Sequence, residues 1–255
     1  MQIFEDSALV KCNRLSEGIY EMYLKTKAAE YAKPGQFVMV YPKDSSTILP
    51  RPISICEVCE DSLRLVYRVQ GKGTREFSLY KEGESVKVLG PLGNGFPVEA
   101  GRGKKSILIG GGIGVPPILE LAKALKGEDV TVLAGYRNSD LFLDKDFKKQ
   151  ATLEIATEDG SVGVKGNVMD VIREKNIKCD VIYACGPMPM LRAIKKYAEE
   201  NGITAYISLE ERMACGVGAC LGCVCKTVKK DAHSHVNNAR VCTEGPVFEA
   251  SEVEI

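Results

Sequence analysis

The sequence predicts an antiparallel β barrel, then an α/β unit built on a parallel sheet, then a tail with little regular structure. Two changes of pattern along the 255 residues lead to this prediction. Short β-like runs separated by turns fill residues 8–98, and strand-like segments alternate with helix-like segments up to residue 209. From residue 210 the periodicity fades and cysteines become frequent. We therefore expect three domains, at 1–98, 99–209 and 210–255.

The barrel is predicted from β-like runs at 19–26, 37–42, 52–58, 63–69 and 86–89. A short helix is expected at 74–81. The run at 63–69 has the period-2 alternation of a strand with one face in a core, its apolar set being Leu63, Leu65, Tyr67 and Val69.

The α/β unit is predicted from strands at 107–109, 130–134, 153–156, 181–184 and 205–209, with helices at 116–126, 141–149, 168–175 and 189–200. Such alternation indicates a parallel sheet that is covered on both faces. Ligands of open parallel sheets bind beyond the carboxyl ends of the strands. The loops after Ile109 and Ala184 are therefore the expected positions of a site.

Composition excludes several function classes. The chain has 34 basic and 34 acidic residues, so no net positive charge favours nucleic acid or an anionic membrane. The least polar stretch, 106–119, is too short for a membrane span and is interrupted by glycines and prolines. Residues 1–14 are too polar for a secretory signal. We expect a cytoplasmic protein whose thiols stay reduced, with neither nucleic acid nor membrane as a partner.

The cysteines are the most specific motif. Half of the ten lie between Cys215 and Cys242. Four follow the CxxxxCxxC pattern with a distant fourth that is typical of plant-type [2Fe-2S] ligation: Cys215, Cys220, Cys223 and Cys242. Zinc is the alternative, although it usually binds two CxxC pairs. Cys225 is a spare thiol, and the two histidines, His233 and His235, lack a Rieske pattern and are expected to be solvated loop residues.

A glycine-rich turn follows the strand that ends at Ile109. It contains Gly112 and Gly114 and opens a helix at Pro116, as in turns that bind a diphosphate. Val115 occupies the last glycine position of GxGxxG, so the dinucleotide fingerprint is not met. The motif alone leaves nucleotide binding and a simple tight turn equally open.

Two further motifs are weak when taken singly. Arg51, at the start of the RPIS sequence, and the turn before Thr74 could together bind a phosphate. An exposed arginine and an ordinary strand-to-helix turn explain the same residues. Cys185, in a CGP sequence after a strand, could equally be a buried structural thiol.

Taken in order, the motifs RPIS, YRVQGKGT, GGGIGVPP and CGPMPM resemble the ferredoxin-NADP reductase superfamily. In that superfamily a barrel binds flavin and an α/β domain binds a nicotinamide nucleotide. The tail sequences SLEERMACGVGACLGC and RVCTEGPVF narrow the resemblance to the electron-transfer subunits of B-type, NAD-dependent dihydroorotate dehydrogenases. This resemblance covers essentially the whole chain.

The resemblance assigns roles to individual residues. The FAD site would comprise Arg51, Pro52, Ile53, Ser54, Val66, Tyr67, Arg68, Gly73 and Thr74. Gly112 and Gly114 would border the nicotinamide nucleotide, and Cys185 would lie near the nicotinamide as the catalytic residue. Where NADP-using members carry a serine and an arginine, this chain has Thr157 and Glu158, followed by Asp159. The two carboxylates favour NAD, because they repel a 2′-phosphate. The four cysteines of the tail motif would ligate iron.

The implied function is electron transfer between NAD(H) and an FMN-containing catalytic subunit through FAD and a [2Fe-2S] cluster. That partner would oxidise dihydroorotate to orotate in pyrimidine biosynthesis, in a heterotetramer with two copies of each subunit. No motif of this chain forms a pyrimidine site, so the substrate rests on the family alone. Alternatives in the same class are subunits of a sulfide dehydrogenase, a ferredoxin-dependent transhydrogenase or a hydrogenase diaphorase. From another class, a redox-sensing or zinc-stabilised module without turnover also remains open.

Overall fold

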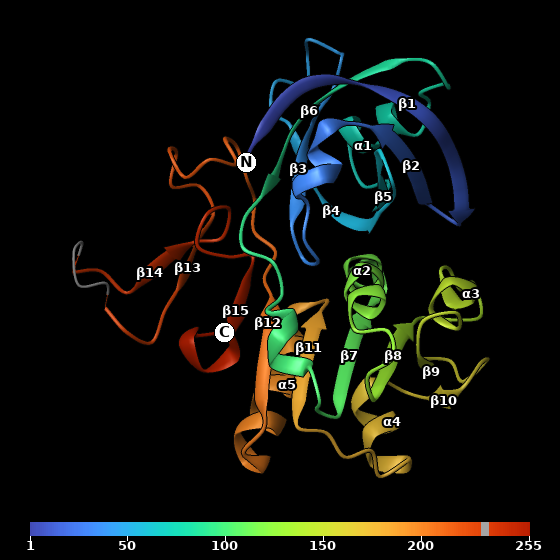
Figure 1. Ribbon diagram of the computed structural model, residues 1–255, viewed down its shortest axis with the longest axis vertical. Coiled ribbons are helices and arrows are strands. Elements are labelled where there is room, and N and C mark those ends of the chain that lie inside the picture. Colours follow the sequence, from blue (N-terminus) through green and yellow to red (C-terminus); the bar gives the residue numbers. More distant parts are fainter. Residues whose placement is uncertain (231–234) are drawn as a thin grey trace.

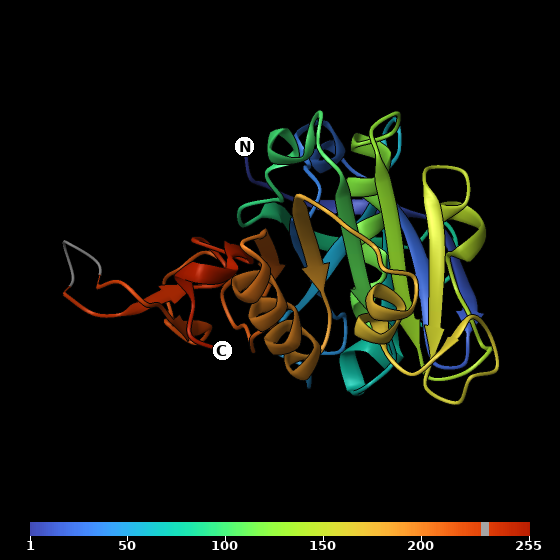
Figure 2. The same ribbon diagram turned by 90° about the horizontal axis from the view of Figure 1, so that it is seen from below.

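The computed structural model describes residues 1–230 and 235–255 and contains a β barrel, an α/β sheet and a smaller tail (Figure 1). Helix α2 (Pro116–Ala124) lies between the barrel and the sheet. The tail lies to one side of both and projects away from them (Figure 2). The predicted combination of a barrel with an α/β unit is confirmed.

Six antiparallel strands close the barrel in the order β1-β2-β5-β4-β3-β6. Their bounds are β1 (Ile3–Ser16), β2 (Ile19–Lys25), β3 (Phe37–Tyr41), β4 (Arg51–Val58), β5 (Ser62–Arg68) and β6 (Ser85–Leu92). All but β1 are predicted to within a few residues. Helix α1 (Lys72–Phe77) begins and ends earlier than the expected 74–81. Two 3₁₀ helices complete this region, η1 (Lys27–Tyr31) and η2 (Val98–Gly101).

The sequence does not predict β1, although this strand is 14 residues long. Its buried residues are only Ser7, Leu9 and Ser16. Apolar alternation is the main sequence signal for a strand, and two serines do not provide it. Pairing with β2 and β6 on either side holds β1 in the barrel.

Strand β5 differs from the prediction of one buried face. Leu63, Leu65 and Tyr67 are buried in the barrel as expected, and Val69, just beyond the strand, is partly buried against the same core. Arg64 and Val66 on the opposite face are buried as well. Val66 packs in a cluster with Ile118 and Leu119 of α2, because the α/β unit covers this side of the barrel. The period-2 alternation therefore predicts the face in the barrel core but not the face buried against the α/β unit.

The second sheet has seven strands in the order β10-β9-β8-β7-β11-β12-β15. The bounds are β7 (Ser106–Gly111), β8 (Val130–Tyr136), β9 (Thr152–Thr157), β10 (Val164–Lys165), β11 (Val181–Cys185) and β12 (Thr204–Ser208). The chain runs from β7 outward to β10 and returns to β11 on the other side of β7. The topological switch point, where such folds bind ligands, lies between β7 and β11.

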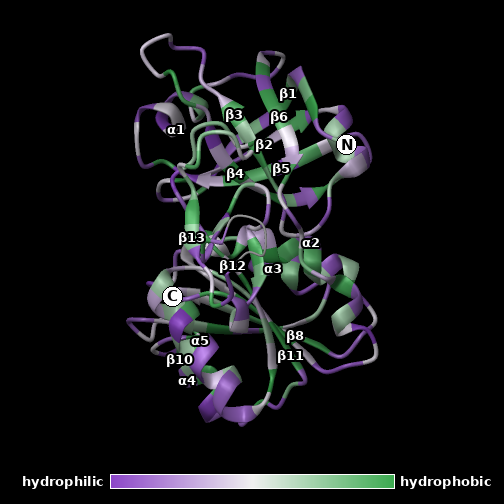
Figure 3. Ribbon diagram, turned by 90° about the vertical axis from the view of Figure 1, so that its left-hand side faces the viewer, coloured by the Kyte–Doolittle hydropathy of each residue, from purple (hydrophilic) through white to green (hydrophobic). Residues whose placement is uncertain are grey.

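The helices of this unit are α2, α3 (Asp144–Phe147), α4 (Val168–Glu174) and α5 (Met188–Asn201), with the 3₁₀ turn η3 (Gly112–Gly114) before α2. Purple, hydrophilic segments mark α4 and α5, whereas β8 and β11 are largely green (Figure 3). Helix α3 is shorter than the expected 141–149, because Leu143 adopts a left-handed φ of 65° and the helix begins after it. In the described ranges, no helix is long and apolar enough to cross a membrane.

The tail contains strands that the sequence does not predict. An antiparallel pair joins β13 (Val224–Lys226) to β14 (Asn238–Arg240). Strand β15 (Val247–Glu249) then pairs with β12, and the 3₁₀ helix η4 (Ala250–Glu252) follows. The tail thus supplies the edge strand of the sheet, while the expected domain boundary at 209/210 stays a prediction.

A network of charged side chains joins the barrel to the α/β unit. The Arg64 guanidinium lies 2.8 Å from Glu21, 3.2 Å from Glu57 and 3.1 Å from Asp146 of α3. The Lys123 ammonium of α2 lies 3.0 Å from Glu57. The Arg64 and Glu21 side chains are only 8% and 5% exposed, so each neutralises a charge that water cannot reach. This network therefore fixes the relative position of the two bodies.

We predict that Arg64→Met lowers the free energy of unfolding by about 3–5 kcal/mol, because it removes the buried cation 2.8 Å from the Glu21 carboxylate and leaves only the exposed Lys11 ammonium at 3.9 Å. Urea denaturation of the purified chain measures this loss. Lys25→Met is the matched control, since its ion pair with Asp61 is 63% and 60% exposed and its removal should leave the midpoint unchanged. Equal midpoints for Arg64→Met and the unmodified chain would contradict the role of the network.

Candidate functional site: two cofactor sites and a thiol loop

The carboxyl ends of β7 and β11 form the switch point of the sheet. Gly110 of β7 is opposite Cys185 of β11. A Cβ on Gly114 would lie 2.3 Å from the Cys185 carbonyl oxygen, so only glycine allows the turn to pack on this strand end. Gly112 in the same turn has a positive φ of 55°. The two loops singled out from the sequence are therefore in direct contact.

The barrel reaches the same point through the end of β5. A Cβ on Gly112 would lie 3.5 Å from Nη2 of Arg68. Glu210, just beyond β12, is a further charged group here that the sequence argument does not single out. The Glu210 side chain keeps contact with solvent, but the surrounding protein removes part of its hydration, and this desolvation raises the pKa of its carboxyl group. The nearby Arg68 charge partly opposes the shift. The residues expected at the flavin and those expected at the nucleotide thus approach each other here.

The residues expected to hold FAD lie on β4, β5 and α1. Ile53 and Tyr67 are buried in the barrel core, and Val66 is buried in the interface with α2. Only backbone groups of these three residues are available to a ligand. Arg51 and Pro52 are partly exposed and Arg68 is exposed, so their side chains can reach one.

Arg51 lies over the first turn of α1. A Cβ on Gly73 would lie 3.0 Å from Nε of Arg51, so the Arg51 side chain packs close against the backbone of this turn. The Arg51 Nη1 group donates to the Leu49 carbonyl oxygen at 2.6 Å. The Thr74 hydroxyl accepts the Gln70 N–H at 2.9 Å and stabilises the turn before the helix.

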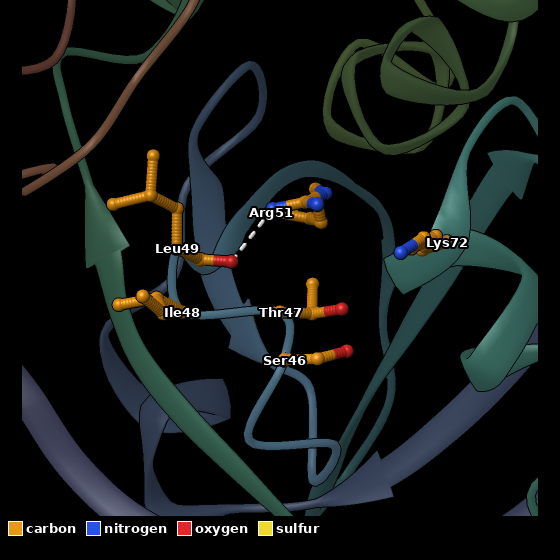
Figure 4. A pocket seen from close by; sticks show the side chains of 6 residues that line it. All are labelled: Ser46, Thr47, Ile48, Leu49, Arg51 and Lys72. Atoms are coloured by element: carbon orange, nitrogen blue, oxygen red, sulfur yellow. Dashed lines mark hydrogen bonds between the residues drawn. The ribbon is translucent and has the colours of Figure 1, made fainter.

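A cavity of about 330 Å³ opens beside Arg51 (Figure 4). Its lining comprises Ser46, Thr47, Ile48, Leu49, Arg51 and Lys72. The sequence argument does not assign a role to the Lys72 side chain, although its position between two glycines in the GKGT turn is a signal for one. Two cations on one cavity suit an anionic group such as a diphosphate.

The three residues expected at the nucleotide ribose differ in their freedom to bind it. The buried Thr157 hydroxyl donates to the Val162 carbonyl oxygen at 2.8 Å and so shapes its own loop. The Asp159 carboxylate accepts the Ser161 hydroxyl at 2.6 Å and the Ser161 N–H at 2.9 Å, and these bonds lower the Asp159 pKa. Glu158 is exposed, which makes it the carboxylate best placed to meet a ribose.

Cys185 is buried at the end of β11. Burial raises the pKa of its thiol, and the Glu210 carboxylate raises it further. Cys185 is therefore a neutral thiol at physiological pH. It can pack against a ring and donate a weak hydrogen bond, but it is not an activated nucleophile.

The four cysteines of the tail motif lie close together. Cys215 bonds to Cys220 and Cys242 to Cys223, and Cys215 is also near enough to Cys242 to raise the pKa of the Cys242 thiol. Gly218, with a positive φ of 80°, directs its N–H toward Cys242. Across the described residues, no three potential ligands surround a single metal position.

The thiol loop, residues 215–223 together with Cys242, favours negatively charged sulfur on its outer side. Burial acts to raise the pKa of Cys215, but the N–H groups of Val217, Cys220 and Ala219 outweigh it and lower the value to about 6. The Val217 N–H lies 3.4 Å from the Cys215 sulfur. On the inner side, burial and the neighbouring Cys223 raise the Cys242 pKa to about 11. N–H groups that already point at sulfur are what a bound anionic cluster requires.

His235 is exposed, as expected of a loop residue. His233 lies outside the described residues. Cys225, the spare thiol, lies in β13 opposite Ala239.

Comparison with known proteins agrees with this geometry. Residues 210–254 match the family model described as the iron-sulfur cluster binding domain of dihydroorotate dehydrogenase B. The dihydroorotate dehydrogenase B (NAD(+)) electron transfer subunit of Geobacillus sp. (strain WCH70) is 43% identical, with 98% of each chain covered. The subunit of the same name from Listeria monocytogenes serotype 4a is also 43% identical, with 97% of each chain covered.

The chain belongs to the dihydroorotate dehydrogenase B electron transfer subunit family. This confirms the family resemblance inferred from the motifs and makes the protein a subunit of an NAD-dependent oxidoreductase. Among solved structures, an NADH-dependent reduced ferredoxin-NADP oxidoreductase is similar, with a TM-score of 0.84, 28% identity, and coverage of 97% of this chain and 89% of that one. A ferredoxin NADP+ reductase from Neisseria gonorrhoeae shares the fold at a TM-score of 0.67 and 14% identity, with 82% and 94% covered.

For this electron transfer subunit we predict that Glu158→Arg raises the affinity for NADPH relative to NADH, because the guanidinium pairs with a 2′-phosphate that the carboxylate repels. Steady-state kinetics with both nucleotides measure the ratio. Glu174→Arg, an equal charge change at the exposed end of α4, is the control. An unchanged ratio for Glu158→Arg would show that the ribose lies elsewhere.

Proposed function

We propose that this chain carries electrons between NAD(H) and a catalytic dihydroorotate dehydrogenase subunit through FAD and a [2Fe-2S] cluster. The observation that carries the proposal is the contact between two thiol pairs and the outer face of a flavin-reductase barrel. Gly216, next to Cys215, packs directly on Met39 of β3. A redox centre in the tail would thus lie one strand away from β4, which begins at Arg51.

The spacing of the thiols favours a two-iron cluster over zinc. A structural zinc ion usually binds two CxxC pairs. Plant-type [2Fe-2S] ligation uses CxxxxCxxC and a distant fourth cysteine, which is the spacing of Cys215, Cys220, Cys223 and Cys242. The match of residues 210–254 to an iron-sulfur cluster binding domain supports the same choice.

FAD fits the barrel site by the chemistry of its donors. Arg51 and Lys72 line one cavity and would neutralise a diphosphate. Backbone groups of Ile53, Val66 and Tyr67 are available to the rest of the cofactor. Arg68 reaches Gly112 and would hold the flavin end of the site against the nucleotide turn.

The nucleotide fits the switch point as NAD. At Gly112 a Cβ would meet only the Arg68 side chain, so a diphosphate could approach the turn there beside β11, and Glu158 is free to bond a ribose hydroxyl. With both cofactors bound, this chain would divide the two electrons of a hydride from NADH into single-electron transfers. Cys185 would orient the nicotinamide by packing, since its raised pKa keeps the thiol neutral.

The partner subunit is proposed to be the FMN-containing catalytic subunit of dihydroorotate dehydrogenase, in a complex with two copies of each chain. Apolar side chains exposed around the thiol loop support a docking partner there: Val217, Leu221 and Val224. The relatives are named electron transfer subunits, which implies a separate catalytic subunit. A ferredoxin-linked transhydrogenase subunit is the alternative that the 28% identical solved structure suggests. The higher identity of 43% favours dihydroorotate.

We predict that Cys223→Ser removes the cluster and abolishes NAD reduction by dihydroorotate in the complex, while NADH still bleaches the flavin. The reason is that the buried Cys223 thiol supplies half of one ligand pair. Iron content, cluster absorbance and flavin bleaching measure the three effects.

Cys225→Ser is the matched control, because this thiol lies two residues away and outside the two pairs. It should retain iron and activity. Loss of iron in Cys225→Ser with retention in Cys223→Ser would overturn the ligand assignment. Loss of flavin bleaching in Cys223→Ser would show that the tail is needed for the whole fold.

A further inference from the structure

Met39 is the side chain on which the thiol loop rests. A Cβ on Gly216 would lie 2.7 Å from Cγ and 3.1 Å from the sulfur of Met39, and 3.1 Å from Cδ1 of Leu92. Met39 is 0% exposed and Leu92 is 1% exposed. The bare backbone next to Cys215 therefore touches both side chains without intervening water.

Met39 also stands beside the strand expected to hold the flavin. In the β3–β4 ladder Met39 is opposite Pro52, and Phe37 is opposite Ser54. Residues directly opposite each other on paired strands point to the same face of a sheet. The alternate pair, Val38 and Ile53, points into the barrel core. Met39 therefore shares the outer face with Pro52.

The surroundings of Met39 are apolar on the side of the thiols as well. One continuous core cluster contains Met39, Leu92, Cys223 and Cys242. The medium between β3 and the inner thiols, Cys223 and Cys242, is thus apolar, and the Met39 thioether brings a polarizable group into contact with the loop.

Leu92 touches the same glycine but occupies a different place in the barrel. It lies on β6, and β3 separates β6 from β4 in the strand order. Met39 alone of these two side chains both contacts the loop and lies next to β4. A substitution at Leu92 therefore tests packing against the loop alone, whereas a substitution at Met39 also tests a role between the two redox sites.

We propose that Met39 is the positioning residue that sets the spacing between the flavin and the iron-sulfur cluster, and that electrons cross between them over its side chain. The inference rests on the proposed function. Two single-electron transfers over Met39 would carry the two electrons of one hydride from NADH, and the proton of that hydride would leave to solvent. The step runs in either direction.

The test uses the complete complex with its catalytic partner and with FAD and cluster loaded. After rapid mixing with NADH under anaerobic conditions, flavin bleaching and cluster bleaching are followed separately. The electron paramagnetic resonance spectrum and the iron content of each variant report whether the cluster itself is intact. The variants are Met39→Ala, Met39→Leu and Leu92→Ala.

Met39→Ala should lose most of the rate of cluster reduction, with flavin bleaching, iron content and the resonance spectrum unchanged. Met39→Leu keeps the volume and should restore most of the rate. Leu92→Ala loses comparable packing against Gly216 and should reduce its cluster normally. If Met39→Ala fails to assemble the cluster, Met39→Val replaces it with the same expectation.

Normal cluster reduction in Met39→Ala or its replacement, with an intact cluster, would overturn the role of Met39. Equal slowing in Leu92→Ala would also overturn it, since packing alone would then explain the effect. Failure of the proposed function is distinct from both results: in that case NADH would bleach the flavin of the unmodified complex and no cluster would be reduced.

Discussion

The position of the tail depends on two contacts that act together. At its end, β15 pairs with β12 and becomes the edge of the parallel sheet. At its start, the backbone at Gly216 lies against Met39 and Leu92 of the barrel. Within its described residues the tail has three short strands and little core of its own, so these contacts and a bound cluster must supply its order. They also place the thiols at a fixed distance from the barrel.

The position of the barrel relative to the sheet is also fixed by specific contacts. Arg64 and Lys123 connect charged groups of the barrel with those of α2 and α3. At the switch point, the absence of side chains at Gly112 and Gly114 lets Arg68 and the end of β11 approach the same turn. Hydride transfer needs a near-contact geometry between two rings, and rigid bodies joined in this way can provide it.

The sequence predicts the parts whose signal is local and misses those that depend on neighbours. Strands with apolar alternation, the glycine turn and the cysteine spacing are all readable in the chain. Strand β1 is not, because its pairing rather than its pattern orders it, and neither is the burial of Arg64 under α3. The sequence gives Thr157, Glu158 and Asp159 equal roles at the ribose. The structure shows that the Thr157 hydroxyl is bonded to Val162 and the Asp159 carboxylate to Ser161.

The central claim is that four thiols of the tail hold a pair of irons beside a barrel-bound flavin. Its most direct test is the content of iron, acid-labile sulfide and FAD in the protein purified anaerobically with its partner. The account predicts about two irons and two sulfides for each FAD. A single zinc ion per chain, or the absence of both iron and sulfide, would contradict it.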